Sequence, residues 1–254
     1  MAPLPVALKS DTIVECVFEV RFAAGNPSAA DLLPGMVFDR LRKYFQNSTQ
    51  LPIAQIPKLL RDQNPQLLYQ PTHALQGRNN VRMMLGQRVV ALSFAKPYQG
   101  WEFVQSRIVE CIQGVLSTDL TGTPERFSLK YSNVLSHGRD ENDLSQLKLR
   151  VSLDEFTLRA AATVIRAEID RNDCINIVEV MSGATVVLQL PAGVVQAKGV
   201  LLSVDTVRNG PFANFSKDLP QMLETAHTTE KEIFFGLLEK QTLEKLGPVY
   251  ATEH

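Results

Sequence analysis

The sequence predicts an α+β fold, and three observations carry this prediction. Two stretches with helical spacing separate alternating strands between residues 1 and 136, in the order of the split βαβ unit. Residues 137–254 are rich in alternating segments, and such a meander favours antiparallel pairing. A long apolar stripe at helical spacing then closes the chain. We therefore expect a ferredoxin-like βαββαβ half at 1–136 and an antiparallel sheet with a long C-terminal helix at 137–254, as two units or one continuous domain.

The first expected element is a strand at residues 13–22. Its apolar side chains fall on one face and its charged ones on the other, the period-two pattern of a sheet with one solvated side. The apolar set is Val14, Cys16, Phe18, Val20 and Phe22. A helix is expected next, because apolar residues between positions 37 and 45 recur at helical spacing after a break at 24–27.

Three further strands are expected at residues 66–70, 81–85 and 88–94, the last two joined by a turn at Gly86. Prolines interrupt the stretch between 47 and 64, where only a short helical turn at 58–61 is predicted. The clearest helix covers residues 101–115, where Trp101 opens the apolar face and anchors the helix on the sheet. A strand at 126–133 completes the first half.

The polar segment at 137–143 is the best boundary between the halves. Beyond it, alternation predicts strands at 147–153, 165–170, 175–181, 184–190 and 199–207. The closing helix is expected over residues 219–238, with its apolar stripe running on either side of Glu230 and with Ser216 as the capping residue.

Composition places the chain among ordinary globular proteins. It has 254 residues, 44% hydrophobic and 21% charged, and a formal net charge of −1, so it has no global attraction to polyanions. The cysteines are odd in number and lack CxxC spacing, which predicts buried thiols in a reducing compartment. No signal-peptide pattern and no apolar run of about 20 residues is present, so we expect a cytoplasmic location and no membrane contact.

No motif for catalysis, for a cofactor or for a metal ion appears in the sequence. The four histidines lack HxH and HExxH spacing, and GxSxG, GxGxxG and GxxxxGK[ST] are all missing. We therefore expect a protein that is not an enzyme and needs no cofactor. His227 and Glu230 share one face of the closing helix at i, i+3 spacing; this permits a metal or acid–base pair but favours a surface or interface histidine.

The densest charge cluster lies at residues 166–173. On a strand, Arg166, Glu168 and Asp170 share one face, and two carboxylates at this spacing suit acid–base chemistry or a divalent ion. The favoured interpretation is a solvated sheet face with cross-strand ion pairs to Lys148 and Arg150.

Nucleic-acid binding is the alternative class of function. A ferredoxin-like sheet often presents basic and aromatic side chains to RNA. Such a face would be formed by Arg82, Arg88, Arg126, Lys130 and Tyr131. The RNP-type aromatic pattern is missing, however, and acidic residues interleave with the basic ones.

Five segments together resemble a family of sporadically distributed, uncharacterised prokaryotic proteins of about this length. They are 13–22, 98–103 with Trp101, 126–133, 202–205 and 226–242 with His227. The resemblance implies a patchy, horizontally moved gene, as in accessory, toxin–antitoxin and phage-defence loci. It brings no established activity and no catalytic residues.

We therefore predict a non-enzymatic accessory or partner protein of a mobile or defence-type locus, namely a subunit, an antitoxin or a regulator. It would act through contacts with a protein partner or in a homo-oligomer. Phe235 lies about 100° from Phe234 around the helix and would feed an interface if Phe234 is buried. The competing interpretation is structural: Trp101 and Tyr131 would only pack in the core, and Asn133 would form hydrogen bonds at a sheet edge. The candidate interaction residues are Phe235, Arg126, Lys130, Tyr131, Asn133 and His227.

Overall fold

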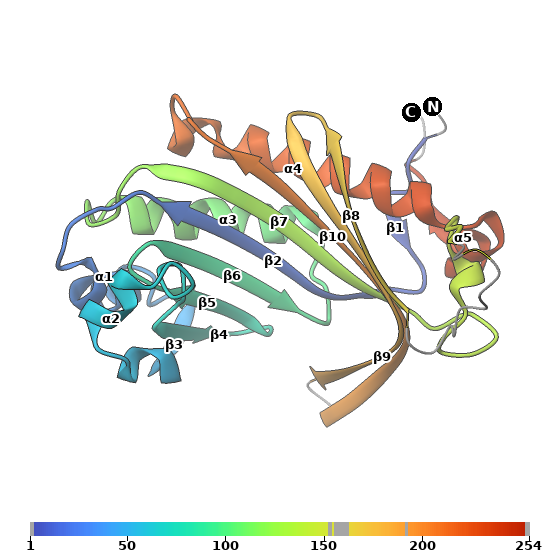
Figure 1. The fold of residues 1–254 in the computed structure, drawn as a ribbon, viewed down its shortest axis with the longest axis horizontal. Helices are drawn as coiled ribbons and strands as arrows, with labels where there is room; N and C mark the ends of the chain where they lie inside the picture. Colours follow the sequence, from blue (N-terminus) through green and yellow to red (C-terminus); the bar gives the residue numbers. More distant parts are fainter. Residues whose placement is uncertain (1–2, 152–153, 155–162, 191–192, 252–254) are drawn as a thin grey trace.

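The computed structural model describes residues 3–151, 154, 163–190 and 193–251. Within these residues it is an α+β structure: five α-helices and one large antiparallel sheet, with a separate two-stranded ribbon (Figure 1). The strand order in the large sheet is β3-β4-β5-β6-β2-β7-β10-β9-β8. Its strands are β2 (Ile13–Phe22), β3 (Phe45–Gln50), β4 (His73–Gly77), β5 (Val81–Leu85), β6 (Val89–Ala95), β7 (Pro124–Leu135), β8 (Val164–Arg171), β9 (Cys174–Leu190) and β10 (Gly193–Asn209).

Helices α1, α3 and α4 pack on one face of this sheet, which we call the helix face, and the other side is called the opposite face. Side chains of α1, α3 and α4 join those of β2 and β7 in the main hydrophobic core. The helices are α1 (Ala29–Arg40), α2 (Lys58–Gln63), α3 (Trp101–Leu116), α4 (Phe215–Leu237) and α5 (Lys240–Leu246). The ribbon pairs β1 (Ala7–Leu8) with β11 (Pro248–Val249), which brings both ends of the chain together.

One sheet joins the residues on both sides of the polar segment 137–143. Strand β7 pairs with β2 on one side and with β10 on the other, both antiparallel. Tyr131 lies opposite Cys16 on β2 and opposite Val204 on β10. Because side chains alternate along a strand, Tyr131 and Asn133 point to the helix face while Arg126 and Lys130 point to the opposite face.

The main core confirms the amphipathic patterns of β2 and α3. Phe18 and Phe22 on β2 are fully buried, as are Ile108 and Ile112 on α3. A second buried cluster lies under the C-terminal part of α4, where Phe234 packs near residues of β10. All three cysteines are free and buried, as expected.

A register shift in β2 corrects one prediction. Val14 was expected on the same face as Cys16, but pairing with β7 slips between Ile13 and Glu15. The extra residue turns Val14 to the opposite face, where it packs with Val134 and Leu188. Ile13 instead packs against the main core.

The first half contains more strands than the predicted βαββαβ order. Strands β5, β6, β2 and β7 are neighbours and antiparallel throughout, and β3 and β4 extend this set at one edge. The strand expected at 66–70 is wrong, because these residues form turns and the strand is β4 instead.

Three predictions in the second half also need correction. Residues 147–151 form no strand: Leu147 makes one isolated bridge to Leu238, and 152–153 lie outside the described residues. The segments 175–181 and 184–190 belong to a single strand, β9. Ser216 lies inside α4, and the N-cap residue is Asn214, which makes no side-chain cap hydrogen bond.

Among the described residues, the helices include none with the length and apolar character needed to cross a bilayer.

Candidate functional site

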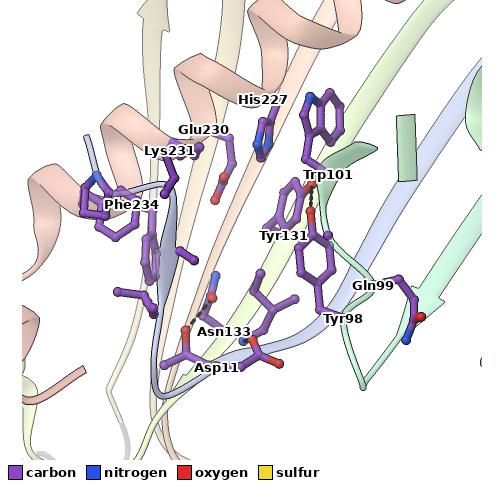
Figure 2. A pocket seen from close by; sticks show the side chains of 18 residues that line it. Asp11, Tyr98, Gln99, Trp101, Tyr131, Asn133, His227, Glu230, Lys231 and Phe234 are labelled. Carbon is purple, nitrogen blue, oxygen red and sulfur yellow. Dashed lines mark hydrogen bonds between the residues drawn. The ribbon is translucent and has the colours of Figure 1, made fainter. Parts of the chain in front are cut away.

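A pocket of about 420 Å³ lies on the helix face, between α4 and the sheet (Figure 2). We call it the α4 pocket. Its walls come from α4, from the end of β7, from the loop before α3 and from the N-terminal segment at residues 5–13. Four parts of the chain that are distant in sequence therefore meet here.

One side of α4 supplies the polar end of the α4 pocket. Glu230 and Lys231 each lie three or four residues from His227 and from Phe234, so the four residues share one side of the helix. Figure 2 shows Glu230 pointing from α4 into the space above Asn133. Packing of α4 on the sheet therefore places the Glu230 carboxyl group in a mostly apolar site.

Glu230 is 4% exposed, and no other described residue forms a hydrogen bond with its carboxyl group. Burial raises the pKa of Glu230 to about 8, and the positive charge of Lys231 offsets only part of this rise. At neutral pH most molecules therefore hold this side chain as a protonated, uncharged acid.

His227 is held neutral in the same region. Its ring stacks on Trp101, with ring centres 4.0 Å apart and an angle of 15° between the planes. Burial lowers the pKa of His227 to about 3, with a further contribution from Lys231. Its Nδ1 atom is buried and has no hydrogen-bond partner among the described residues. A neutral imidazole has one acceptor nitrogen and one N–H, and a protonated carboxyl has an O–H as well as acceptor oxygens, so His227 and Glu230 offer both donors and acceptors to a ligand.

Trp101 anchors the start of α3 against α4. Its Nε1–H donates to Glu224 Oε2 at 2.7 Å, and Gln105 donates to the same oxygen at 3.4 Å. Gly100, which precedes the helix, has a φ of +89°, a conformation that side-chain-bearing residues rarely adopt. A glycine at this position therefore lets the chain turn so that the indole can reach α4.

Two tyrosines form the floor of the α4 pocket. The hydroxyl groups of Tyr98 and Tyr131 lie 3.0 Å apart and bond to each other, and the rings meet edge to face. Burial raises the pKa of both hydroxyls and also that of the Cys16 thiol beneath them. Beside them, Thr12 donates to Asn133 Oδ1 at 2.9 Å.

The N-terminal segment closes one side of the α4 pocket. Residues 5–8 line it, and backbone bonds tie this segment to the C-terminal end of the chain. Val6 N donates to Val249 O at 2.7 Å, and Lys9 N donates to Gly247 O at 2.9 Å. A second hollow of about 640 Å³ shares Trp101, His227 and Lys231 as lining residues, so the Trp101–His227 stack borders both spaces.

The structure divides the six predicted interaction residues into two groups. Four of them line the α4 pocket: Tyr131, Asn133, His227 and Phe235. Arg126 and Lys130 lie on the opposite face. Arg126 donates to Glu19 at 3.0 Å, and Lys130 Nζ lies 3.4 Å from Glu179.

Sequence reasoning did not place Tyr98, Trp101 or the N-terminal segment at a site. The shared helical face of His227 and Glu230 was the available signal, but spacing alone does not show which face of a helix is buried. Phe234 is buried as supposed, and Phe235 packs edge to face against it at the pocket.

The charged cluster on β8 is exposed to solvent. Arg166 pairs with Glu168 at 2.8 Å and with Glu179 at 3.6 Å. The ion pairs expected from this face to Lys148 and Arg150 are wrong for the described residues: 147–151 form no strand beside β8, and Lys148 Nζ donates to the carbonyl of Gly236. In the described part of the chain, no three His, Cys, Asp or Glu side chains gather so as to hold a metal ion.

Comparison with known proteins gave no match, either to a family model or to a curated protein. The resemblance to the sporadic prokaryotic family therefore stays a prediction.

Proposed function

We propose that this chain is a non-enzymatic accessory protein that works by binding, and that the α4 pocket is its binding site. The observation that carries the proposal is a pair of polar side chains in one aromatic pocket. Glu230 is 4% exposed and forms no hydrogen bond with another described residue, and His227 Nδ1 is a buried atom without a partner among the described residues. Buried polar groups nearly always have hydrogen-bond partners, and a missing partner costs about 1–3 kcal/mol. A ligand in the pocket would supply them.

The titratable groups around Glu230 favour binding over chemistry. A nucleophile needs a lowered pKa or an adjacent base. Burial instead raises the pKa of the Cys16 thiol and of both tyrosine hydroxyls, and it lowers the pKa of His227. These groups are thus held in their neutral, weakly reactive forms at neutral pH.

Among a subunit, an antitoxin and a regulator, the pocket favours a regulator that responds to a ligand. The proposal retains a cytoplasmic location, a protein partner or a second copy of the chain, and a mobile or defence-type prokaryotic locus. Phe235 supports a link between ligand and partner, because it is half-buried and lies at the pocket's border.

The finer description of the first half belongs to the same proposal. The order β5-β6-β2-β7, with α1 and α3 on one face, supports a ferredoxin-like unit extended by β3 and β4.

Nucleic-acid binding through the sheet is the competing function. Tyr131 is 2% exposed and lies on the helix face, so it cannot join Arg126 and Lys130 in one recognition surface. The carboxylates of Glu19 and Glu179 also offset those two cations.

Capture from the protein's own cells tests the proposal. Tagged wild-type protein, Phe235→Glu and the double variant Arg126→Gln, Lys130→Gln would be isolated natively, and bound protein, nucleic acid and small molecules identified. We expect one defined component that Phe235→Glu loses and the double variant keeps. Nucleic acid lost only from the double variant, or nothing bound to any of the three, would overturn the proposal.

A further inference from the structure

We infer that the α4 pocket binds a small primary amine. The ammonium group of this ligand would pair with Glu230, and its apolar part, about the size of one aromatic ring, would pack against the surrounding aromatic side chains. This inference deepens the proposed function and rests on it, because it names the class of ligand for the same pocket.

The ionised form of Glu230 presents acceptor oxygens only, so a ligand that pairs with this form must bring donors. The Glu230 carboxylate offers two acceptor oxygens, and neutral His227 offers one acceptor nitrogen. Of the donors that line the pocket, the Trp101 N–H bonds to Glu224 and the two tyrosine hydroxyls bond to each other. The Lys231 ammonium and the Asn133 amide also line the pocket and donate to no other described residue. An ammonium group carries three donors and no acceptor, which complements this arrangement.

The walls of the pocket suit a cation as well as an apolar body. Aromatic faces attract cations through their ring quadrupole, and aromatic groups surrounding a carboxylate are a recurrent means of binding ammonium ligands. The rings that line the pocket belong to Tyr98, Trp101, Tyr131, Phe234 and Phe235. Its volume of about 420 Å³ falls within the range of small-molecule sites. Residues 5–8 line one side of the pocket and would exclude a ligand with a longer apolar chain.

Amine binding should depend on pH through Glu230. Below its pKa of about 8, the carboxyl must release a proton before it can pair with an ammonium group. Affinity is therefore expected to fall about tenfold for each pH unit below 8 and to level off above it. The titratable or charged groups that face this region from other positions are Asp11, Cys16, Tyr98, Tyr131, His227 and Lys231.

Trp101 gives a direct signal for ligand binding in the intact 254-residue chain, because it is the only tryptophan of this chain. Its fluorescence and isothermal calorimetry would follow titrations with 2-phenylethylamine, with the neutral 2-phenylethanol and with the anionic 3-phenylpropionate. We expect the amine to bind at least tenfold more tightly than the other two at pH 8. Glu230→Gln should abolish this preference and the pH dependence.

Three results would overturn the inference: equal or tighter binding of 3-phenylpropionate, unchanged amine affinity in Glu230→Gln, or no binding of any probe. Thermal melting of Glu230→Gln provides the folding control, and Glu179→Gln on the opposite face is the matched variant that should bind the amine like wild type. Binding of the alcohol or the acid alone would refute the amine and keep the pocket as a binding site. The capture experiment judges the proposed function separately.

Discussion

The two faces of the sheet at β7 differ in whether their charged side chains have partners. On the opposite face, Arg126 and Lys130 are partly exposed and each has a carboxylate partner. On the helix face, only a few residues along the same strand, Tyr131 and Asn133 lie beneath a buried carboxyl that has no partner among the described residues. Exposed ion pairs contribute about 0–1 kcal/mol, whereas an unmatched buried group costs more than they return. The comparison assigns a structural role to the first set and a binding role to the second.

Adjacent residues of β7 test this division with the largest expected effect. Tyr131→Ala removes a buried aromatic side chain and should lower the free energy of unfolding by about 3–5 kcal/mol. Lys130→Ala removes one partner of a partly exposed ion pair and should change the free energy of unfolding by less than about 1 kcal/mol. Urea unfolding followed by circular dichroism measures both values. Equal losses in the two variants would show that the faces do not differ as described.

The pH dependence of stability sharpens the comparison. The pKa of Glu230 is raised from 4.5 to about 8 in the folded protein, so its stabilising contribution is complete below 4.5 and is lost as the pH rises to 8. The pKa of His227 is lowered from 6.5 to about 3, so it destabilises the fold as the pH falls from 6.5 to 3. The two effects oppose each other between 4.5 and 6.5. Of these two groups, only Glu230 changes its protonation between pH 6.5 and 8.

Wild-type protein should therefore lose about 2 kcal/mol of unfolding free energy between pH 6.5 and 8 and then remain level. Glu230→Gln should not show this loss, because its amide does not titrate. Glu179→Gln, which changes a carboxylate on the opposite face, should keep it. Urea unfolding at half-unit pH steps gives the three curves, and a loss of the same size in Glu230→Gln would assign the effect to another group.

The smallest expected effect concerns Trp101 fluorescence, which should not change near pH 6.5, the usual pKa of a histidine side chain. A protonated histidine in contact with an indole quenches its emission, and His227 stacks directly on Trp101. Since burial keeps the pKa of His227 near 3, Trp101 emission should stay constant from pH 5 to 7. A step centred on 6.5 that disappears in His227→Gln would show that the ring is hydrated.

Much of the fold could be predicted from sequence because single elements carry their own patterns. Strand β2 and helix α3 alternate apolar and polar residues at the spacing of their structures, and both are found where expected. Strand β3 was missed because five of its six residues are exposed and polar, so its sequence resembles a loop. The reversal of Val14 was missed because a bulge depends on the pairing partner rather than on the strand itself.

The candidate site was harder to predict for the same reason. The face shared by His227 and Glu230 follows from helical spacing, but its burial depends on α4 packing on the sheet. Tyr98 lies in a loop without any periodic pattern, and its pairing with Tyr131 joins positions 33 residues apart. The closure by residues 5–8 requires the two chain ends to meet, which no local pattern encodes.

The most direct test of the central claim is the titration of Glu230 itself. Carbon-13 NMR of protein labelled at the glutamate carboxyl groups would follow each resonance, and Glu230→Gln would assign the one of interest. We expect the Glu230 resonance to titrate with a midpoint near pH 8 in the free protein and with a lower midpoint in the presence of 2-phenylethylamine. A midpoint near 4.5 that the amine does not move would show that the carboxyl is hydrated and paired, and would contradict the account.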